Sequence, residues 1–368
     1  MKDDHELGRA LRELEIPGEA EAEERSWKVV RASYAERPAL RPARRTRGVA
    51  LAVAGGVAAL AIGLSPAGAK VGDLVSEMGE AVGIGEQDAR PALRSLPAAG
   101  ELLVESGQGP WIVREDGSKR LLGDYGEATW SPRGLFVATA DGRELIAVEP
   151  GGEVRWTITP PGPVSDPRWG GAGFDTRIAY RSGSDLRVVA GDGTGDRSVA
   201  RDVAPVAPVW LVPPPESKLD PARRAHALAY LDRRGKVEVV DADTGMPIGD
   251  RAPYRTRVQD LRSDRVHSPT APTAAKLERR RGRSTLSVAG DGRRRVLFSA
   301  RGVLTGPTWS PDGRWLLVGW PEADQWLFIR ADRPQRVIAF DRISEQFDPG
   351  DIGGAGFPGV AGWILPQR

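Results

Sequence analysis

The side chains best suited to catalysis or metal binding are few in this sequence, and they lie far apart. It contains three histidines, His5, His226 and His267, and no cysteine. Neither His226 nor His267 has the H-x-x-x-H or H-E-x-x-H spacing typical of zinc sites. We therefore expect each to be a solvated loop residue. The lack of cysteine excludes disulfides, cysteine-ligated zinc and cysteine nucleophiles.

Other catalytic motifs are also missing. The sequence has no Gly-x-Ser-x-Gly elbow, no Walker loop and no dinucleotide fingerprint, and Gly353-Gly354-Ala355-Gly356 is expected to be a loop. The acidic turns at Asp192, Asp196, Asp241 and Asp243 do not match a calcium loop and are expected at hairpin tips. The sequence thus predicts a protein that is not an enzyme and needs no cofactor. A shallow active site assembled across several repeats is left open.

Basic residues are concentrated in two insertions of a nearly neutral chain. Lys and Arg number 52 against 50 Asp and Glu, which gives no general reason to expect nucleic acid as a partner. The candidates for contact with an anionic surface are Arg223, Arg224, Lys276, Arg279, Arg280, Arg281 and Arg283. One hypothesis is that they engage lipid head groups or an acidic partner. The alternative is a set of solvated, mobile arginines.

These insertions interrupt a repeat that begins near Glu101. Its clearest copies are Thr-Trp-Ser-Pro-Arg-Gly at 129–134 and Thr-Trp-Ser-Pro-Asp-Gly at 308–313, each followed by an apolar run. Proline and glycine suit a tight turn, and the tryptophan offers a large surface that can pack against the next repeat. The positions that mark the repeats are Trp130, Trp169, Trp210, Ser263, Trp309 and Trp363. A spacing near ~40–50 residues is typical of propeller blades with four short strands.

With these motifs, residues 101–368 resemble the WD-repeat-like propellers of the TolB type, whose repeats carry a Trp-Ser-Pro-Asp-Gly turn before an apolar strand. The resemblance is closest at Trp309–Gly313 and Trp130–Gly134 and weaker in the other copies. Residues 1–100 match nothing in TolB, which has a different N-terminal domain. The resemblance therefore implies a fold, and TolB's partners are not carried over to this chain.

The two ends of the repeat region predict how the ring closes. Residues 101–122 supply three strand-like runs, and Val360–Leu365 supplies an innermost strand. Joined in one blade, they complete an all-β, six-bladed propeller without an open edge. Asp264–Arg283 has no apolar alternation, which predicts an irregular loop and a fifth blade with fewer strands. Both basic insertions and both chain ends are predicted on one face, toward the linker and the membrane.

A membrane span is predicted before the propeller. The 22 residues from Gly48 to Ala69 carry no charge and as a helix would be about 33 Å long. Four arginines precede this stretch, and mostly acidic residues follow it, which predicts a cytoplasmic N-terminus and an exported C-terminal region. Two alternatives remain: a buried helix of a soluble domain, and a signal peptide cleaved after Ala69.

The predicted organisation is a partly helical cytoplasmic tail (1–47), a transmembrane helix (48–69), a linker with a short amphipathic helix (70–100) and an extracytoplasmic propeller (101–368). This order predicts a single-pass protein of the cell membrane that serves as a scaffold for a protein or a cell-envelope ligand. The alternative is a transmembrane sensor with a partner-binding tail. That architecture resembles membrane-bound anti-sigma factors, although the zinc-binding type is excluded by the lack of cysteine.

Overall fold

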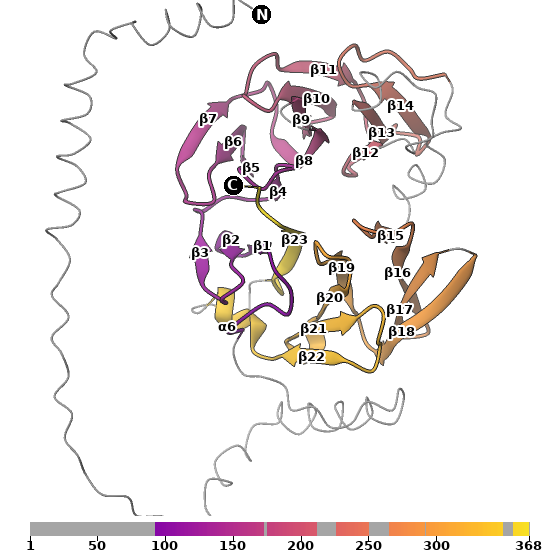
Figure 1. Ribbon diagram of the computed structural model, residues 1–368. Helices are drawn as coiled ribbons and strands as arrows, with labels where there is room; N and C mark the ends of the chain where they lie inside the picture. The colour runs from indigo at the N-terminus through magenta and orange to yellow at the C-terminus, as the bar shows by residue number, and fades with distance from the viewer. Residues whose placement is uncertain are drawn as a thin grey trace, which may run out of the picture. The chain divides into compact units, whose positions relative to one another are not determined.

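The computed structural model describes residues 93–172, 175–211, 226–249, 265–290, 292–348 and 356–367 (Figure 1). All of them belong to the second of two compact units of the chain, Ala61–Arg368. Among these described residues, no helix is long and apolar enough to cross a membrane. The predicted tail 1–47 and span 48–69 lie outside them, so both remain predictions.

The described strands form six antiparallel sheets, which we number as blades in chain order, giving the innermost strand first. Blade 1 contains β23 (Gly359–Ile364), β1 (Glu101–Ser106), β2 (Gly109–Val113) and β3 (Lys119–Leu121). Blade 2 contains β4 (Ala128–Trp130), β5 (Val137–Asp141), β6 (Glu144–Val148) and β7 (Val154–Ile158). Blade 3 contains β8 (Val164–Ala172), β9 (Asp175–Ser182), β10 (Asp185–Ala190) and β11 (Arg197–Ala200).

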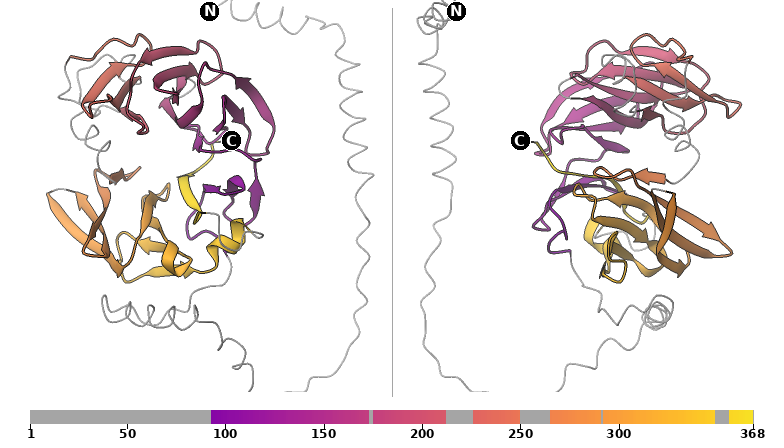
Figure 2. Two further views of the ribbon diagram at one scale, coloured as in Figure 1. Left: turned by 180° about the vertical axis from the view of Figure 1, so that it is seen from behind. Right: turned by 45° about the vertical axis from the view of Figure 1, so that its right-hand side comes forward.

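Blade 4 contains β12 (Val209–Leu211), β13 (Ala227–Leu231) and β14 (Val237–Asp241). Blade 5 contains β15 (Arg265–His267), β16 (Ala274–Arg280), β17 (Arg283–Gly290) and β18 (Arg293–Arg301). Blade 6 contains β19 (Thr305–Trp309), β20 (Trp315–Trp320), β21 (Gln325–Arg330) and β22 (Val337–Phe340). Two short helical segments, η3 (Pro321–Ala323) and α6 (Ile343–Phe347), complete the described elements. The blades follow one another around a ring (Figures 1 and 2).

The two ends of the repeat region share blade 1, as the sequence predicted. Strand β23 pairs antiparallel with β1, from Glu101 opposite Ile364 to Glu105 opposite Gly359. Because β1 also pairs with β2, both of its edges are hydrogen-bonded. The last strand therefore closes the ring and leaves β1 no exposed edge.

The prediction for blade 5 is wrong. Residues 264–283 hold β15 and β16, and the blade has four strands. Strand β16 lacks apolar alternation, but it is an inner strand that pairs with β17 over seven residue positions. Two of its charged side chains also pair with each other, since Lys276 contacts Glu278 at 2.8 Å. The blade with three described strands is blade 4, and residues 250–264, which follow it, lie outside the description.

The repeat tryptophans pack between blades, but against the preceding blade and not the next one. The Nε1 of Trp210 donates to the carbonyl oxygen of Arg168 at 2.8 Å, and that of Trp309 donates to Val266 at 2.9 Å. A Cβ on Gly170 would lie 2.3 Å from Trp210. Glycine is therefore what lets this ring approach the innermost strand of blade 3 so closely.

The core lies between adjacent blades. One cluster joins blades 5 and 6 around Trp309 and Trp320, and another joins blades 6 and 1 around Trp326 and Trp363. Leu93 and Leu96 belong to the second cluster and are 2% and 6% exposed. The packed domain thus begins before Glu101, inside the segment that the sequence assigned to the linker.

Candidate functional site

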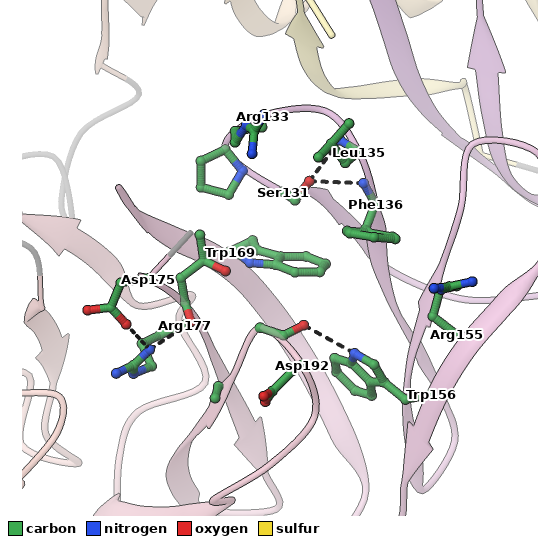
Figure 3. Close-up of a pocket in the computed structure, with 14 residues that line it drawn as sticks. Ser131, Arg133, Leu135, Phe136, Arg155, Trp156, Trp169, Asp175, Arg177 and Asp192 are labelled. Atoms are coloured by element: carbon green, nitrogen blue, oxygen red, sulfur yellow. Dashed lines mark hydrogen bonds and ion pairs between the residues drawn. The ribbon is translucent and has the colours of Figure 1, made fainter. Parts of the chain in front are cut away.

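A pocket of about 550 Å³ lies between blades 2 and 3 (Figure 3). Its walls come from the β4–β5 turn, the start of β7, strand β8, the start of β9 and the β10–β11 turn. The residues that line it are Ser131, Pro132, Arg133, Leu135, Phe136, Arg155, Trp156, Trp169, Asp175, Thr176, Arg177, Ala190, Gly191 and Asp192. Loops after first and third strands emerge on one face because successive strands are antiparallel. The pocket therefore opens on the face where β23 ends.

Three aromatic rings form the apolar part of the pocket. Phe136 and Trp169 stack with ring centroids 6.3 Å apart and planes 15° apart. Trp156 faces the same space from β7, and its Nε1 donates to the carbonyl oxygen of Gly191 at 3.1 Å (Figure 3). A Cβ on Gly193 would lie 2.8 Å from the Trp156 ring. The β10–β11 turn thus holds this ring in place, and Phe136 and Trp156 both remain half-exposed to a ligand.

The Trp-Ser-Pro turn of blade 2 shapes the rim. The hydroxyl of Ser131 accepts hydrogen bonds from the amides of Leu135 at 3.1 Å and Phe136 at 3.0 Å. Gly134 closes the turn with a φ of 67°, which few residues other than glycine adopt. The backbone of Gln367 donates to the carbonyl of Arg133 at 2.9 Å, so the C-terminal segment lies beside the rim.

A network of charged side chains extends from the pocket wall to the contact between blades 3 and 4. Arg177 contacts Asp175 beside it and, through Nε, Asp243 at 3.0 Å. Arg197 reaches the same Asp243 oxygen at 2.8 Å. His226 lies between the two carboxylates, with Nδ1 bonded to Asp243 and Nε2 3.3 Å from Asp175. The side chain of His226 is buried, so the expectation that it is a solvated loop residue is wrong.

The contacts of Asp243 decide its charge state. Burial raises the pKa of this carboxyl, but hydrogen bonds from Arg177 and His226, and their charges, outweigh burial and hold the pKa below its usual value. For Arg177, burial lowers the pKa, but its bonds to Asp243 and Asp175 raise it above the ordinary value. Asp175 and Asp243 thus fix the guanidinium of Arg177 at the pocket wall.

This network gives a pH-dependent stability. A carboxyl whose folded pKa is lowered stabilises the fold above its unfolded pKa of ~3.9, and the contribution is lost as the pH falls through the folded value. The melting temperature of the wild type should therefore fall more steeply below about pH 5 than that of Asp243→Asn. At pH 7 the variant should lose only about 1 kcal/mol, because the Asp243 side chain is 38% exposed. If the melting temperatures of the wild type and Asp243→Asn fall in parallel from pH 7 to about pH 2, the pKa of Asp243 is not lowered by folding.

The other three aspartates of the acidic turns have partners within their own blade. Asp192 accepts from Thr194, and Asp241 accepts from the backbone of Asp243 and Thr244. Asp196 is bonded to Arg187 and to the hydroxyl of Tyr180. Within the described part of the chain, no group of three or more His, Asp or Glu side chains is arranged to hold a metal ion.

The structure describes five of the seven predicted basic residues, and four of these lie at one hairpin. Arg223 and Arg224 lie outside the described residues, and Lys276 lies within β16, bonded to Glu278. Arg279 and Arg280 end β16, Arg281 lies in the turn, and Arg283 begins β17. This hairpin joins second and third strands, so it emerges on the face opposite the chain ends. The sequence had predicted these arginines on the same face as the chain ends.

Comparisons with known proteins concern the fold. No family model matches the chain, and no curated protein matches it. TolB from Acinetobacter baumannii is similar in structure with a TM-score of 0.43 and 12% identity, over 71% of this chain and 66% of that one. For hydrazine synthase from Kuenenia stuttgartiensis the TM-score is 0.41 and the identity 13%, over 67% of this chain and 80% of that one. For a chain of a nidogen/laminin complex the TM-score is 0.41 and the identity 14%, over 66% of this chain and 94% of that one. The propeller-like fold of this chain rests on its own six sheets.

Proposed function

We propose that this chain is a membrane-anchored, extracytoplasmic binding module, and that its ligand occupies the pocket between blades 2 and 3. The observation that carries the proposal is the combination of a stacked aromatic wall with fixed guanidinium groups in one cavity. A pocket of about 550 Å³ falls within the range of small-molecule and side-chain binding sites. The ligand is a small molecule, or the end of a larger envelope component.

The lining indicates the chemistry of that ligand. Half-exposed Phe136 and Trp156 offer flat surfaces for a ring. Three arginines line the pocket; Arg177 is paired with Asp175 and Asp243, and Arg155 lies 3.4 Å from Glu149, so an acidic ligand would compete with Glu149 for the half-exposed guanidinium of Arg155. Arginine pairs with a carboxylate through two parallel hydrogen bonds, which lysine cannot do. We therefore propose a ligand with a ring and a carboxylate or similar acidic group.

Binding without catalysis accounts for the polar groups. The hydroxyl of Ser131 is occupied by two amides of its own turn, and the carboxylates of Asp175 and Asp243 are occupied by Arg177. His226 contacts those same carboxylates and is buried, and it is not among the residues that line the pocket. The anchor is proposed from the uncharged stretch at 48–69.

A panel of defined compounds tests the proposal on the full chain. It contains aromatic carboxylates, uronic acids and short peptides with a C-terminal aromatic residue, each paired with its neutral amide or ester. We expect at least one acid to quench tryptophan fluorescence, with its neutral counterpart bound roughly tenfold more weakly. Phe136→Leu and Arg155→Gln should each weaken binding by roughly three- to tenfold.

Two variants outside the pocket are matched controls. Phe357→Leu changes a partly buried phenylalanine near blade 1, and Arg120→Gln removes an exposed arginine on β3. Both should bind like the wild type. Equal affinity for acids and their neutral counterparts would refute the proposed ligand class. If no compound binds and a pull-down from the native envelope recovers the same partners with wild type and Phe136→Leu, the pocket is not the binding site.

A further inference from the structure

The tip of the β16–β17 hairpin carries four arginines within five positions. We call Arg279, Arg280, Arg281 and Arg283 the basic tip; all four side chains are exposed. None of them has an ion-pair partner among the described residues, whereas Lys276 and Arg294 in the same blade both contact Glu278. Within blade 5, β18 is the outermost strand and β17 lies next to it (Figures 1 and 2).

The backbone of the turn suggests that these charges do not serve the fold. Arg281 and Gly282 have φ angles of 52° and 75°, as in the two-residue turn that favours asparagine, aspartate or glycine. Arginine is an unfavourable choice at the first of these positions. Arg280 also stands directly opposite Arg283, and Arg283 opposite Arg301, and like charges facing across strands are destabilising. A sequence optimised for this hairpin alone would have neither feature.

We propose that the basic tip binds the surface of an anionic phospholipid membrane. Protein interfaces have an apolar or aromatic core, but the tip has only arginines and a glycine. The exposed large apolar residue described in this blade is Val296 on β18. It lies five positions from Arg301, the β18 residue beside the tip, and so does not adjoin the tip. A convex, purely cationic element suits a fluid surface whose charges can rearrange around it. An acidic protein is the competing partner, and the experiment separates the two.

The tether permits this contact even though the tip faces away from the chain ends. If the anchor ends at Ala69, as proposed above, residues 70–92 span up to roughly 75–80 Å when extended, and roughly 55 Å if about a dozen of them form the predicted amphipathic helix. A propeller of this size has a diameter of roughly 45 Å. Either face of the ring can therefore reach the membrane. The inference is independent of the ligand pocket, which lies on the other face.

Flotation with anionic vesicles tests the inference. The full chain is held in nanodiscs of neutral phosphatidylcholine and mixed with separate vesicles that contain either phosphatidylcholine alone or about 30% phosphatidylglycerol. We expect it to float with the anionic vesicles at about 50 mM salt and to be released at about 500 mM. Replacing the four tip arginines by glutamine should weaken binding by roughly tenfold or more.

Two further variants make the test decisive. Replacing Arg120, Arg201, Arg234 and Arg333 by glutamine removes four exposed charges from other blades and should leave vesicle binding within about twofold of wild type. Replacing the tip arginines by lysine should also preserve binding, because a lipid surface needs charge and not a guanidinium geometry. The proposal is overturned if the wild type fails to float with anionic vesicles, if both glutamine variants lose binding equally, or if the lysine variant loses binding with its melting temperature unchanged. The first outcome would leave an acidic protein as the partner of the tip.

Discussion

A chain that ends before β23 is expected to lose its cooperative unfolding transition. Strand β23 covers the inner edge of β1 from Glu101 to Glu105 and brings Trp363, which is 8% exposed, into the cluster between blades 6 and 1. Losing one buried tryptophan costs roughly 3–5 kcal/mol, and the unpaired strand edge adds to this. Because a domain's total stability is roughly 5–15 kcal/mol, removal of residues 356–368 should abolish the sharp melting transition.

The measurement is a thermal melt followed by near-ultraviolet circular dichroism, which reports the packed tryptophans. A chain that lacks only residues 366–368 is the control, because it keeps all of β23 and loses only the hydrogen bond from Gln367 to Arg133 and Pro366 beside Gly134. It should melt within a few degrees of the full chain. A peptide of residues 356–368 added to the truncated chain should restore the transition by strand addition. If the truncated chain melts like the full one, ring closure through β23 does not hold the domain together.

The blade repeat was predictable because turns are local. Gly134 and Gly313 have φ angles of 67° and 65°, so the Trp-Ser-Pro turns need glycine at these positions. The turn geometry therefore produces a motif that can be recognised in the sequence. Strand β16 was missed for the opposite reason. It is held by backbone pairing on both sides and by ion pairs of Glu278, and neither produces an apolar alternation.

The site was harder to predict because its parts meet only in the folded ring. Phe136 and Trp169 stack although they are separated by the whole of β5 to β7, and His226 lies between aspartates from two blades. The Trp-Ser-Pro turn did mark the rim of the pocket. The arginines of blade 5 were noticed as a group, but mistaking one hairpin for the preceding loop moved them to the wrong face, because antiparallel strands alternate in direction.

Replacing Trp309 by alanine should reduce the free energy of unfolding by roughly 3–5 kcal/mol, since the ring is 5% exposed and joins blades 5 and 6. Trp309→Phe keeps most of the packing but loses the hydrogen bond to Val266, and should cost roughly 1–2 kcal/mol. Met246→Ala, at a side chain that is 67% exposed, should stay within about 0.5 kcal/mol of wild type. Urea denaturation gives all three values. A loss below about 1 kcal/mol for Trp309→Ala would show that the repeat tryptophans do not hold adjacent blades together.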